Sequence, residues 1–135
     1  MRSLLERSLK EGAFGISFNL GSAHGRSAGE EEIIELHKAA AEAGLLVKHH
    51  LEDEGKNILP ALSRLISLAR DSKAGIHISH FKALGRTAWS LFPNALEMIE
   101  RAIKEGCKLT CDFFPFLRTG SNLYMLLPGW AREGG

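Results

Sequence analysis

Apolar residues along the chain follow two spacings, one typical of strands and one typical of helices. Short runs of alternating or continuous apolar residues predict strands, whereas apolar residues three and four positions apart predict amphipathic helices. The expected strands are 13–20, 45–50, 75–80 and 107–114. The expected helices are 3–11, the segment from a capping box at Ser27–Glu30 to Gly44, the segment that follows Asn57, and the segment from Pro93 to Gly106.

This order predicts an α/β fold. Strands that alternate with helices at such spacing pair in parallel through right-handed crossovers. About four such units make half of a TIM-type (β/α) barrel, whose eight strands typically take ~250 residues. Because no repeat, low-complexity segment or linker divides the sequence, we expect residues 1–135 to form a single domain with a partial TIM-type barrel.

The composition narrows the classes of partner. Lys and Arg number 17 against 16 Asp and Glu, and the resulting formal net charge of +1 gives no electrostatic reason to expect nucleic acid or a membrane surface as a partner. The longest apolar runs fall far short of the ~20 residues of a membrane-spanning helix. Cys107 and Cys111 are expected to be buried apolar residues on one face of a strand, not a disulfide scaffold. We therefore expect a cytoplasmic location.

Histidine closes the apolar runs of two successive strand segments, at His50 and at His80. In a barrel of parallel strands, the carboxyl ends of the strands carry the chemistry. Imidazole is a common ligand of metal ions that activate water, so His50 and His80 are candidate ligands of one metal ion. A lone histidine is more often a hydrogen-bonded structural residue, and the spacing alone leaves that alternative open.

Strand alternation predicts which side chains accompany these histidines. The side chains expected to point inward are Leu46, Lys48, Ile76, Ile78, Lys82, Thr110, Asp112 and Phe114. Those expected to face the helices or to point out are Val47, His49, His77, Ser79, Cys107, Leu109, Cys111 and Phe113. A register slip of one residue would put His49 in place of His50.

The remaining polar groups suggest no second site. His24 and His37 are expected on the solvated surface, and Glu52–Glu54 is expected to form a solvated loop in preference to a general-base cluster. The glycine-rich segments lack the spacing of a phosphate-binding loop.

Six short segments together point to a known family. They are Glu11–Ser17 (EGAFGIS), His50–Gly55 (HLEDEG), Ile78–Ala83 (ISHFKA), Gly85–Arg86 followed by Trp89, Cys111–Phe116 (CDFFPF) and Leu127–Gly135 (LPGWAREGG). In these segments the chain resembles the N-acyl-D-amino-acid deacylases (D-aminoacylases) of the amidohydrolase superfamily. The resemblance runs along nearly the whole chain, and it is the combination of segments that makes it specific.

The resemblance implies the central half of a metal-dependent hydrolase that cleaves the amide of N-acyl-D-amino acids, with zinc as the usual metal and one or two ions in the complete enzyme. It places His50 and His80 on the family's metal-binding histidines, at the ends of the fifth and sixth barrel strands. Lys82 falls on a lysine used toward the substrate carboxylate. Ser121 falls near a substrate-contacting serine, in a loop that is one residue longer here.

Parts of the family pattern have no counterpart in this chain. The resemblance implies a His-x-His pair on the first strand, an early metal-binding cysteine and a general-base aspartate on the last strand, and none of these is present. Cys107 and Cys111 lie on the wrong strand to replace that cysteine. Phe114 and Phe116 stand where tyrosines are usual. We therefore assign no catalytic residue and expect the chain alone to be inactive.

Two other functions stay open. A cyclic amidase of the dihydroorotase or hydantoinase type would use Lys48 as a carbamylated bridging lysine. A non-catalytic half-barrel would instead pair with a complementing chain or form a homo-oligomer, because the open edges of a parallel sheet need cover.

Overall fold

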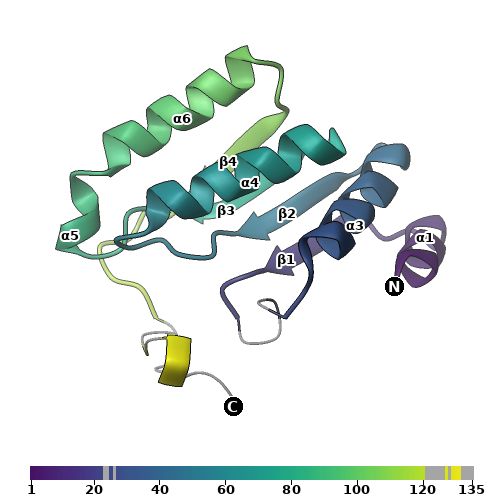
Figure 1. Ribbon diagram of the computed structural model, residues 1–135, viewed down its shortest axis with the longest axis horizontal. Helices are drawn as coiled ribbons and strands as arrows, with labels where there is room; N and C mark the ends of the chain where they lie inside the picture. Colours follow the sequence, from purple (N-terminus) through teal and green to yellow (C-terminus); the bar gives the residue numbers. More distant parts are fainter. Residues whose placement is uncertain (23–24, 26, 121–126, 128, 132–135) are drawn as a thin grey trace.

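Four parallel strands form the centre of the molecule. The structure, a computed structural model, describes residues 1–22, 25, 27–120, 127 and 129–131. The strands are β1 (Gly15–Asn19), β2 (Leu46–His50), β3 (Ile76–Phe81) and β4 (Leu109–Phe113), and they lie in one sheet in the order β1-β2-β3-β4 (Figure 1). All three strand pairs are parallel. This strand order, with a helical crossover between neighbours, is that of successive (β/α) units, so the predicted α/β fold is confirmed.

Helices connect the strands and cover one face of the sheet. They are α1 (Arg2–Lys10), α3 (Glu30–Glu42), α4 (Ile58–Ser72), α5 (Arg86–Trp89) and α6 (Phe92–Lys104), followed by the 3-10 helix η2 (Gly129–Ala131). The helix α4 packs against both α3 and α6, and the three lie side by side in Figure 1. Helix α5 was not predicted, because a helix this short has no apolar period to detect. Helix α3 begins later than the capping box suggested, with Gly29 as its N-cap.

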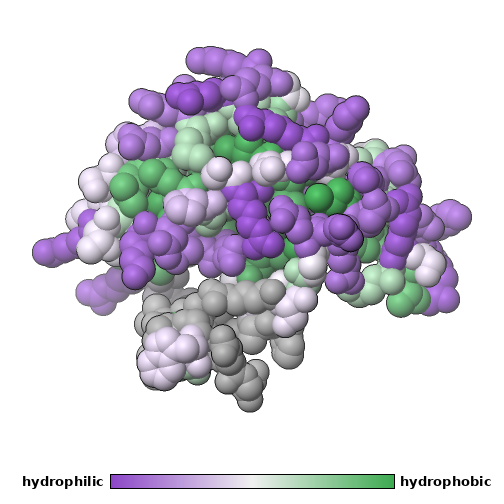
Figure 2. Space-filling model, in the orientation of Figure 1, coloured by the Kyte–Doolittle hydropathy of each residue, from purple (hydrophilic) through white to green (hydrophobic). Residues whose placement is uncertain are grey.

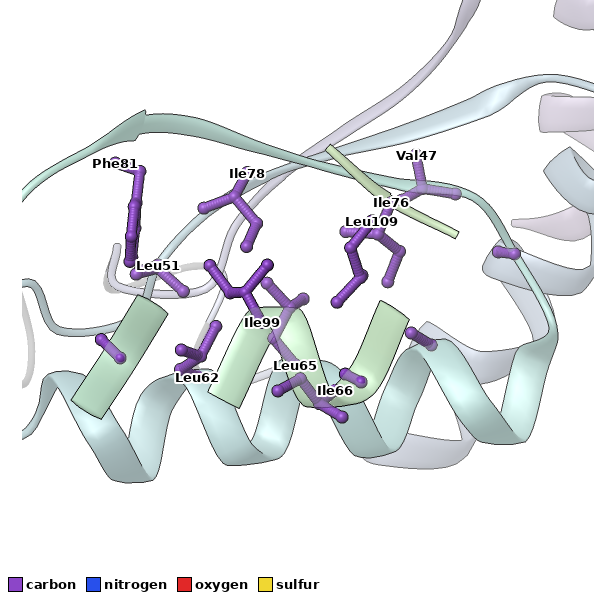
Figure 3. Packing of buried hydrophobic residues seen from close by; sticks show 14 of the residues in the cluster. Val47, Leu51, Leu62, Leu65, Ile66, Ile76, Ile78, Phe81, Ile99 and Leu109 are labelled. Atoms are coloured by element: carbon purple, nitrogen blue, oxygen red, sulfur yellow. The ribbon is translucent and has the colours of Figure 1, made fainter. Parts of the chain in front are cut away.

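The main core lies between the sheet and helices α4 and α6. Its strand residues include Val47, Ile76, Ile78 and Leu109, and its helix residues include Leu62, Leu65, Ile66 and Ile99 (Figure 3). Cys107 and Cys111 are free thiols that pack, half-buried, against this core. Helix α6 buries Ala95, Ile99 and Ala102 against this core, whereas its Ile103 is 47% exposed.

The opposite face of the sheet carries no helix among the described residues, and we call it the open face. It presents Leu46, Lys48, His77, Thr110 and Asp112. On β2 the predicted alternation is confirmed, since Val47 and His49 are buried beneath the helices while Leu46 and Lys48 are exposed. Within the described part of the chain, no helix is both long and apolar enough to cross a membrane. Hydrophilic side chains dominate the surface seen in Figure 2, with apolar ones between them.

On β3 the predicted alternation is wrong, because the strand contains a bulge. Ile78 pairs with Cys111 and Phe81 pairs with Phe113. Between these two pairings β3 moves on by three residues and β4 by only two, so β3 contains one extra residue. The extra residue reverses the phase of the strand. As a result, Ile76, Ile78 and Phe81 all face the core. His77, which was expected to face the helices, lies on the open face beside Thr110 and Asp112.

Candidate metal centre

His50 and His80 meet at the carboxyl ends of neighbouring strands. His50 is the last residue of β2, and His80 lies in the bulged end of β3. The Nδ1 atom of His50 is 2.5 Å from the Nε2 atom of His80, and the ring centroids are 4.6 Å apart. The structure thus brings together the two histidines that the sequence selected.

Glu54 and Lys82 close the far side of the His80 ring. Glu54 lies in the loop after β2, and its Oε1 atom is 2.7 Å from His80 Nδ1. Its other oxygen, Oε2, is 2.5 Å from Lys82 Nζ. Both charged side chains are largely buried, with 14% of Glu54 and 16% of Lys82 exposed. Lys82 Nζ also lies 5.0 Å from the centre of the Phe114 ring, a cation–π distance.

Glu54 is a site residue that the sequence did not single out. The run Glu52–Glu54 was expected to be a solvated loop, and for Glu54 this was wrong. Each acidic residue of the run has its own partner: Glu52 pairs with Arg64, and Asp53 accepts hydrogen bonds from the Gly55 amide and from Asn57. Glu54 differs from Glu52 and Asp53 because the fold brings it beside His80 and Lys82 at the end of β3, which the sequence alone does not show.

The surroundings favour neutral imidazole at His50. Burial lowers the pKa of His50 below its ordinary value, and the neighbouring His80 ring lowers it further. A neutral imidazole has one ring nitrogen with a lone pair, which is the form that binds a metal ion. A hydrogen bond between the two rings would place one N–H between these nitrogens. Metal binding would require that proton to move to the other nitrogen of its ring.

The two imidazoles fit a zinc ion in donor chemistry, and a small separation of the rings would fit the distance as well. Two nitrogens bound to one tetrahedral zinc at ~2.05 Å lie about 3.3 Å apart. The rings of His50 and His80 would therefore separate by less than about 1 Å from their present contact. Among the residues that the structure describes, no group of three or more His, Cys, Asp and Glu side chains surrounds such an ion. The described chain thus offers two ligands and leaves the other coordination positions open.

A second polar cluster lies beside this pair on the open face. Asp112 Oδ2 accepts a hydrogen bond from His77 Nε2 at 2.9 Å, and Lys48 Nζ is 3.6 Å from the same oxygen. The other carboxylate oxygen accepts a hydrogen bond from the backbone N–H of His80. These contacts, with the His77 hydrogen bond the largest cause, lower the pKa of Asp112 to about 2. Asp112 is therefore a carboxylate that links β4 to the end of β3.

A third histidine pair lies on the other side of the sheet, beneath α3. His49 Nε2 and His37 Nε2 are 2.8 Å apart, and Phe18 stacks on His49. Both histidines are fully buried, so the expectation that His37 is a surface residue was wrong. It lies on the face of α3 that packs on the sheet, where its partner supplies a hydrogen bond. Burial lowers the pKa of His37 to about 4 and that of His49 to about 3.

Two residues considered from the sequence, His24 and Ser121, lie outside the described residues. Their roles stay predictions. Lys82, in contrast, lies directly after β3 and beside the histidine pair, held by Glu54.

Comparison with solved structures first defines the fold. An L-hydantoinase from Arthrobacter aurescens has a TM-score of 0.64 over 84% of this chain and 30% of its own, at 17% identity. At that identity the likeness shows the fold alone, and it gives no support to a cyclic amidase. No protein-family model matches the chain.

Closer similarity is found to deacylases. A D-aminoacylase from Alcaligenes xylosoxydans xylosoxydans is 30% identical over 123 residues, which are 91% of this chain and 25% of that protein. A D-aminoacylase structure, described for the functional role of its binuclear metal centre, has a TM-score of 0.80 at 28% identity and covers 86% of this chain and 24% of its own. The N-acyl-D-glutamate deacylase of Bordetella bronchiseptica, complexed with zinc and a phosphonate inhibitor, has a TM-score of 0.81 at 26% identity over 85% of this chain and 24% of its own.

The chain spans about a quarter of the length of these relatives. Sequence and fold nevertheless agree over most of its own length, and the resemblance noted from the sequence segments is confirmed. The chain is thus related to the N-acyl-D-amino-acid deacylases of the amidohydrolase superfamily and corresponds to part of such a protein.

Proposed function

We propose that this chain forms part of a metal-dependent hydrolase that cleaves the amide bond of N-acyl-D-amino acids, and that His50 and His80 bind its zinc ion. The observation that carries the proposal is the 2.5 Å approach of His50 Nδ1 to His80 Nε2 at the carboxyl ends of adjacent parallel strands. This edge is where barrel enzymes of this architecture place their chemistry. The zinc complex of the related glutamate deacylase supports the choice of metal, and the binuclear metal centre of the D-aminoacylase supports a metal site.

Each residue of the candidate metal centre has a distinct role in this proposal. A zinc ion, when bound, would supply a Lewis acid that polarises the amide carbonyl and lowers the pKa of a bound water. His50 and His80 would hold the ion, and Glu54 would fix the orientation of the His80 ring, as carboxylates behind metal-binding histidines do. Lys82 would attract the carboxylate of the substrate and would share its ammonium group with Glu54. Ser121 would contact the substrate.

The proposed reaction needs a group that takes a proton from water and returns one to the leaving amine. We assign that role to no residue of this chain, and the purified chain with zinc is expected to show no hydrolysis of N-acetyl-D-amino acids. The test of the function is therefore a longer protein that joins this segment to the other strands of a complete barrel. We expect it to hydrolyse N-acetyl-D-amino acids in a zinc-dependent way and to leave hydantoins intact. Hydantoin hydrolysis without deacylase activity would favour the cyclic amidase.

A second proposal concerns what covers the sheet. Among the described strands, β1 and β4 each pair on one side only. Phe14, which precedes β1, is 95% exposed, and Phe113, the last residue of β4, is 65% exposed. Unpaired parallel edges of this kind are usually covered. We propose that a complementing chain or a second copy of this chain covers them. Sedimentation over a range of concentrations would show an assembly larger than the monomer, whereas a compact monomer at all concentrations would contradict the proposal.

A further inference from the structure

The residue that most needs an explanation in the site is His80, because its backbone is unusual. Its φ angle is +41°, in the left-handed region that residues with a side chain rarely adopt. The same residue lies in the bulge, between the Ile78 and Phe81 pairings with β4. Such a conformation persists only where its surroundings hold it in place.

The bulge decides which way the His80 ring points. Residues 77 and 80 are three apart, so in a regular strand their side chains would lie on opposite faces. Here His77 contacts Asp112 and Thr110 on the open face, while the His80 ring meets His50 at the end of the same sheet. The extra residue is what allows both orientations, because it reverses the phase between them.

Asp112 is the side chain that contacts β3 both before the bulge and within it. Its Oδ1 atom accepts the hydrogen bond of the His80 backbone N–H, and its Oδ2 atom accepts that of His77 Nε2 at 2.9 Å. One carboxylate on β4 thus binds the residue before the bulge and the residue within it. Lys48, 3.6 Å from Oδ2, adds a positive charge that favours the ionised form.

We propose that Asp112 is a positioning residue, whose carboxylate clamps the β3 bulge and so aims the His80 ring at His50. The expected effect on metal affinity rests on the proposed function. The effect of Asp112 on the orientation of the His80 ring does not, because it concerns contacts within the chain alone. Asp112 would touch neither metal nor substrate. Its effect would pass through the backbone of His80.

Three variants separate this role from general stability. Asp112→Ala removes both acceptor oxygens, and Asp112→Asn keeps one oxygen that can accept the His80 amide. Thr110→Val is the matched control, because it removes the other hydrogen-bond partner of His77 from β4 and leaves the His80 amide untouched. Circular dichroism and a dispersed amide spectrum would establish that each variant is folded.

The first readout is NMR of the isotopically labelled, metal-free chain. In Asp112→Ala we expect the His80 amide resonance to move and the contacts between the His50 and His80 rings to disappear, with Asp112→Asn and Thr110→Val close to the wild type. The second readout is zinc affinity, expected to fall about tenfold or more in Asp112→Ala, as it does when supports of metal ligands are removed.

The two measurements test the metal site and the role of Asp112 independently. If the wild-type chain binds no zinc, the proposed metal site is wrong, and the NMR comparison still tests the clamp. Unchanged His80 resonances and unchanged ring contacts in Asp112→Ala would overturn the clamp whatever the zinc affinity. An equal loss of ring contacts in Thr110→Val would also overturn it, since the effect would then belong to the His77 hydrogen bonds in general.

Discussion

The Oε1 atom of Glu54 lies 2.7 Å from His80 Nδ1. The other ring nitrogen of His80, Nε2, is the one that faces His50. Lys82 Nζ lies 3.1 Å from the same Nδ1 atom as Glu54. If the Glu54 carboxylate accepts the N–H of Nδ1 when a metal is bound, it would hold the ring and increase the basicity of the nitrogen on the far side. The end of β2 therefore supplies a candidate ligand, His50, and the loop that follows it supplies Glu54, which lies beside the other candidate ligand on β3.

Replacing Glu54 with Gln should weaken zinc binding. The substitution keeps the shape of the side chain but removes its charge, and zinc affinity should fall by about 10- to 100-fold, the usual effect of losing such a partner. Titration against a chromophoric chelator measures it. Glu52→Gln is the matched control, because Glu52 lies two residues away and pairs with Arg64, outside the site. Equal affinities for Glu54→Gln and the wild type would show that Glu54 does not support the ligand.

Lys82 and Glu54 should be energetically coupled in the metal-free chain. Both side chains are mostly buried, and their charged atoms are 2.5 Å apart. Lys82→Met leaves a buried carboxylate without its cation and should lower the free energy of unfolding by about 1–3 kcal/mol. The double variant Lys82→Met/Glu54→Gln should cost less than the sum of the single variants. Urea denaturation with chelator present measures each value, and strictly additive costs would contradict the coupling.

The pair His37 and His49 should make the fold sensitive to acid. The pKa of His37 is lowered to about 4 in the folded chain from an ordinary value of 6.5, so below pH 6.5 the unfolded chain binds a proton that the folded chain resists. The free energy of unfolding should therefore fall as the pH decreases from 6.5 toward 4, by up to about 1.4 kcal/mol per pH unit for this residue. His49, whose pKa is lowered to about 3, acts with the same sign.

Denaturation of the metal-free chain at several pH values tests this dependence. His37→Gln keeps a polar partner for His49 and does not titrate, so its stability should decline less steeply between pH 6.5 and 4. A slope equal to that of the wild type would mean that His37 does not carry the effect.

How far the sequence predicts this site depends on the regularity of each strand. On β2 the alternation of Val47, Lys48 and His49 gave the correct faces, and His50 followed from it. On β3 the same rule, applied backward from His80, gave the wrong faces for Ile76, His77 and Ile78, because the bulge between Ile78 and Phe81 reverses the alternation. Such a bulge depends on the pairing with β4 and leaves no pattern in the sequence of β3 itself. His80 was chosen for its place at the end of the run, which the bulge does not alter.

Long-range contacts explain why the predictions for His37 and Glu54 were wrong. The burial of His37 depends on meeting His49 across the α3–β2 packing, and a helix position next to a lysine gives no sign of it. Glu54 differs from Glu52 and Asp53 only through Lys82 and His80, which lie on another strand unit. The sequence predicts periodic elements well because local propensity and burial agree there. The partners and the burial of a single side chain that contacts another strand unit depend instead on the tertiary structure.

The central claim is that His50 and His80 together hold one metal ion, and its most direct test is calorimetric titration of the purified chain with zinc. We predict one zinc per chain for the wild type, a loss of at least about tenfold in affinity for His50→Ala and for His80→Ala, and affinity near the wild-type value for the neighbouring control His77→Ala. Zinc binding that is unchanged in both single variants, or lost equally in His77→Ala, would contradict the claim.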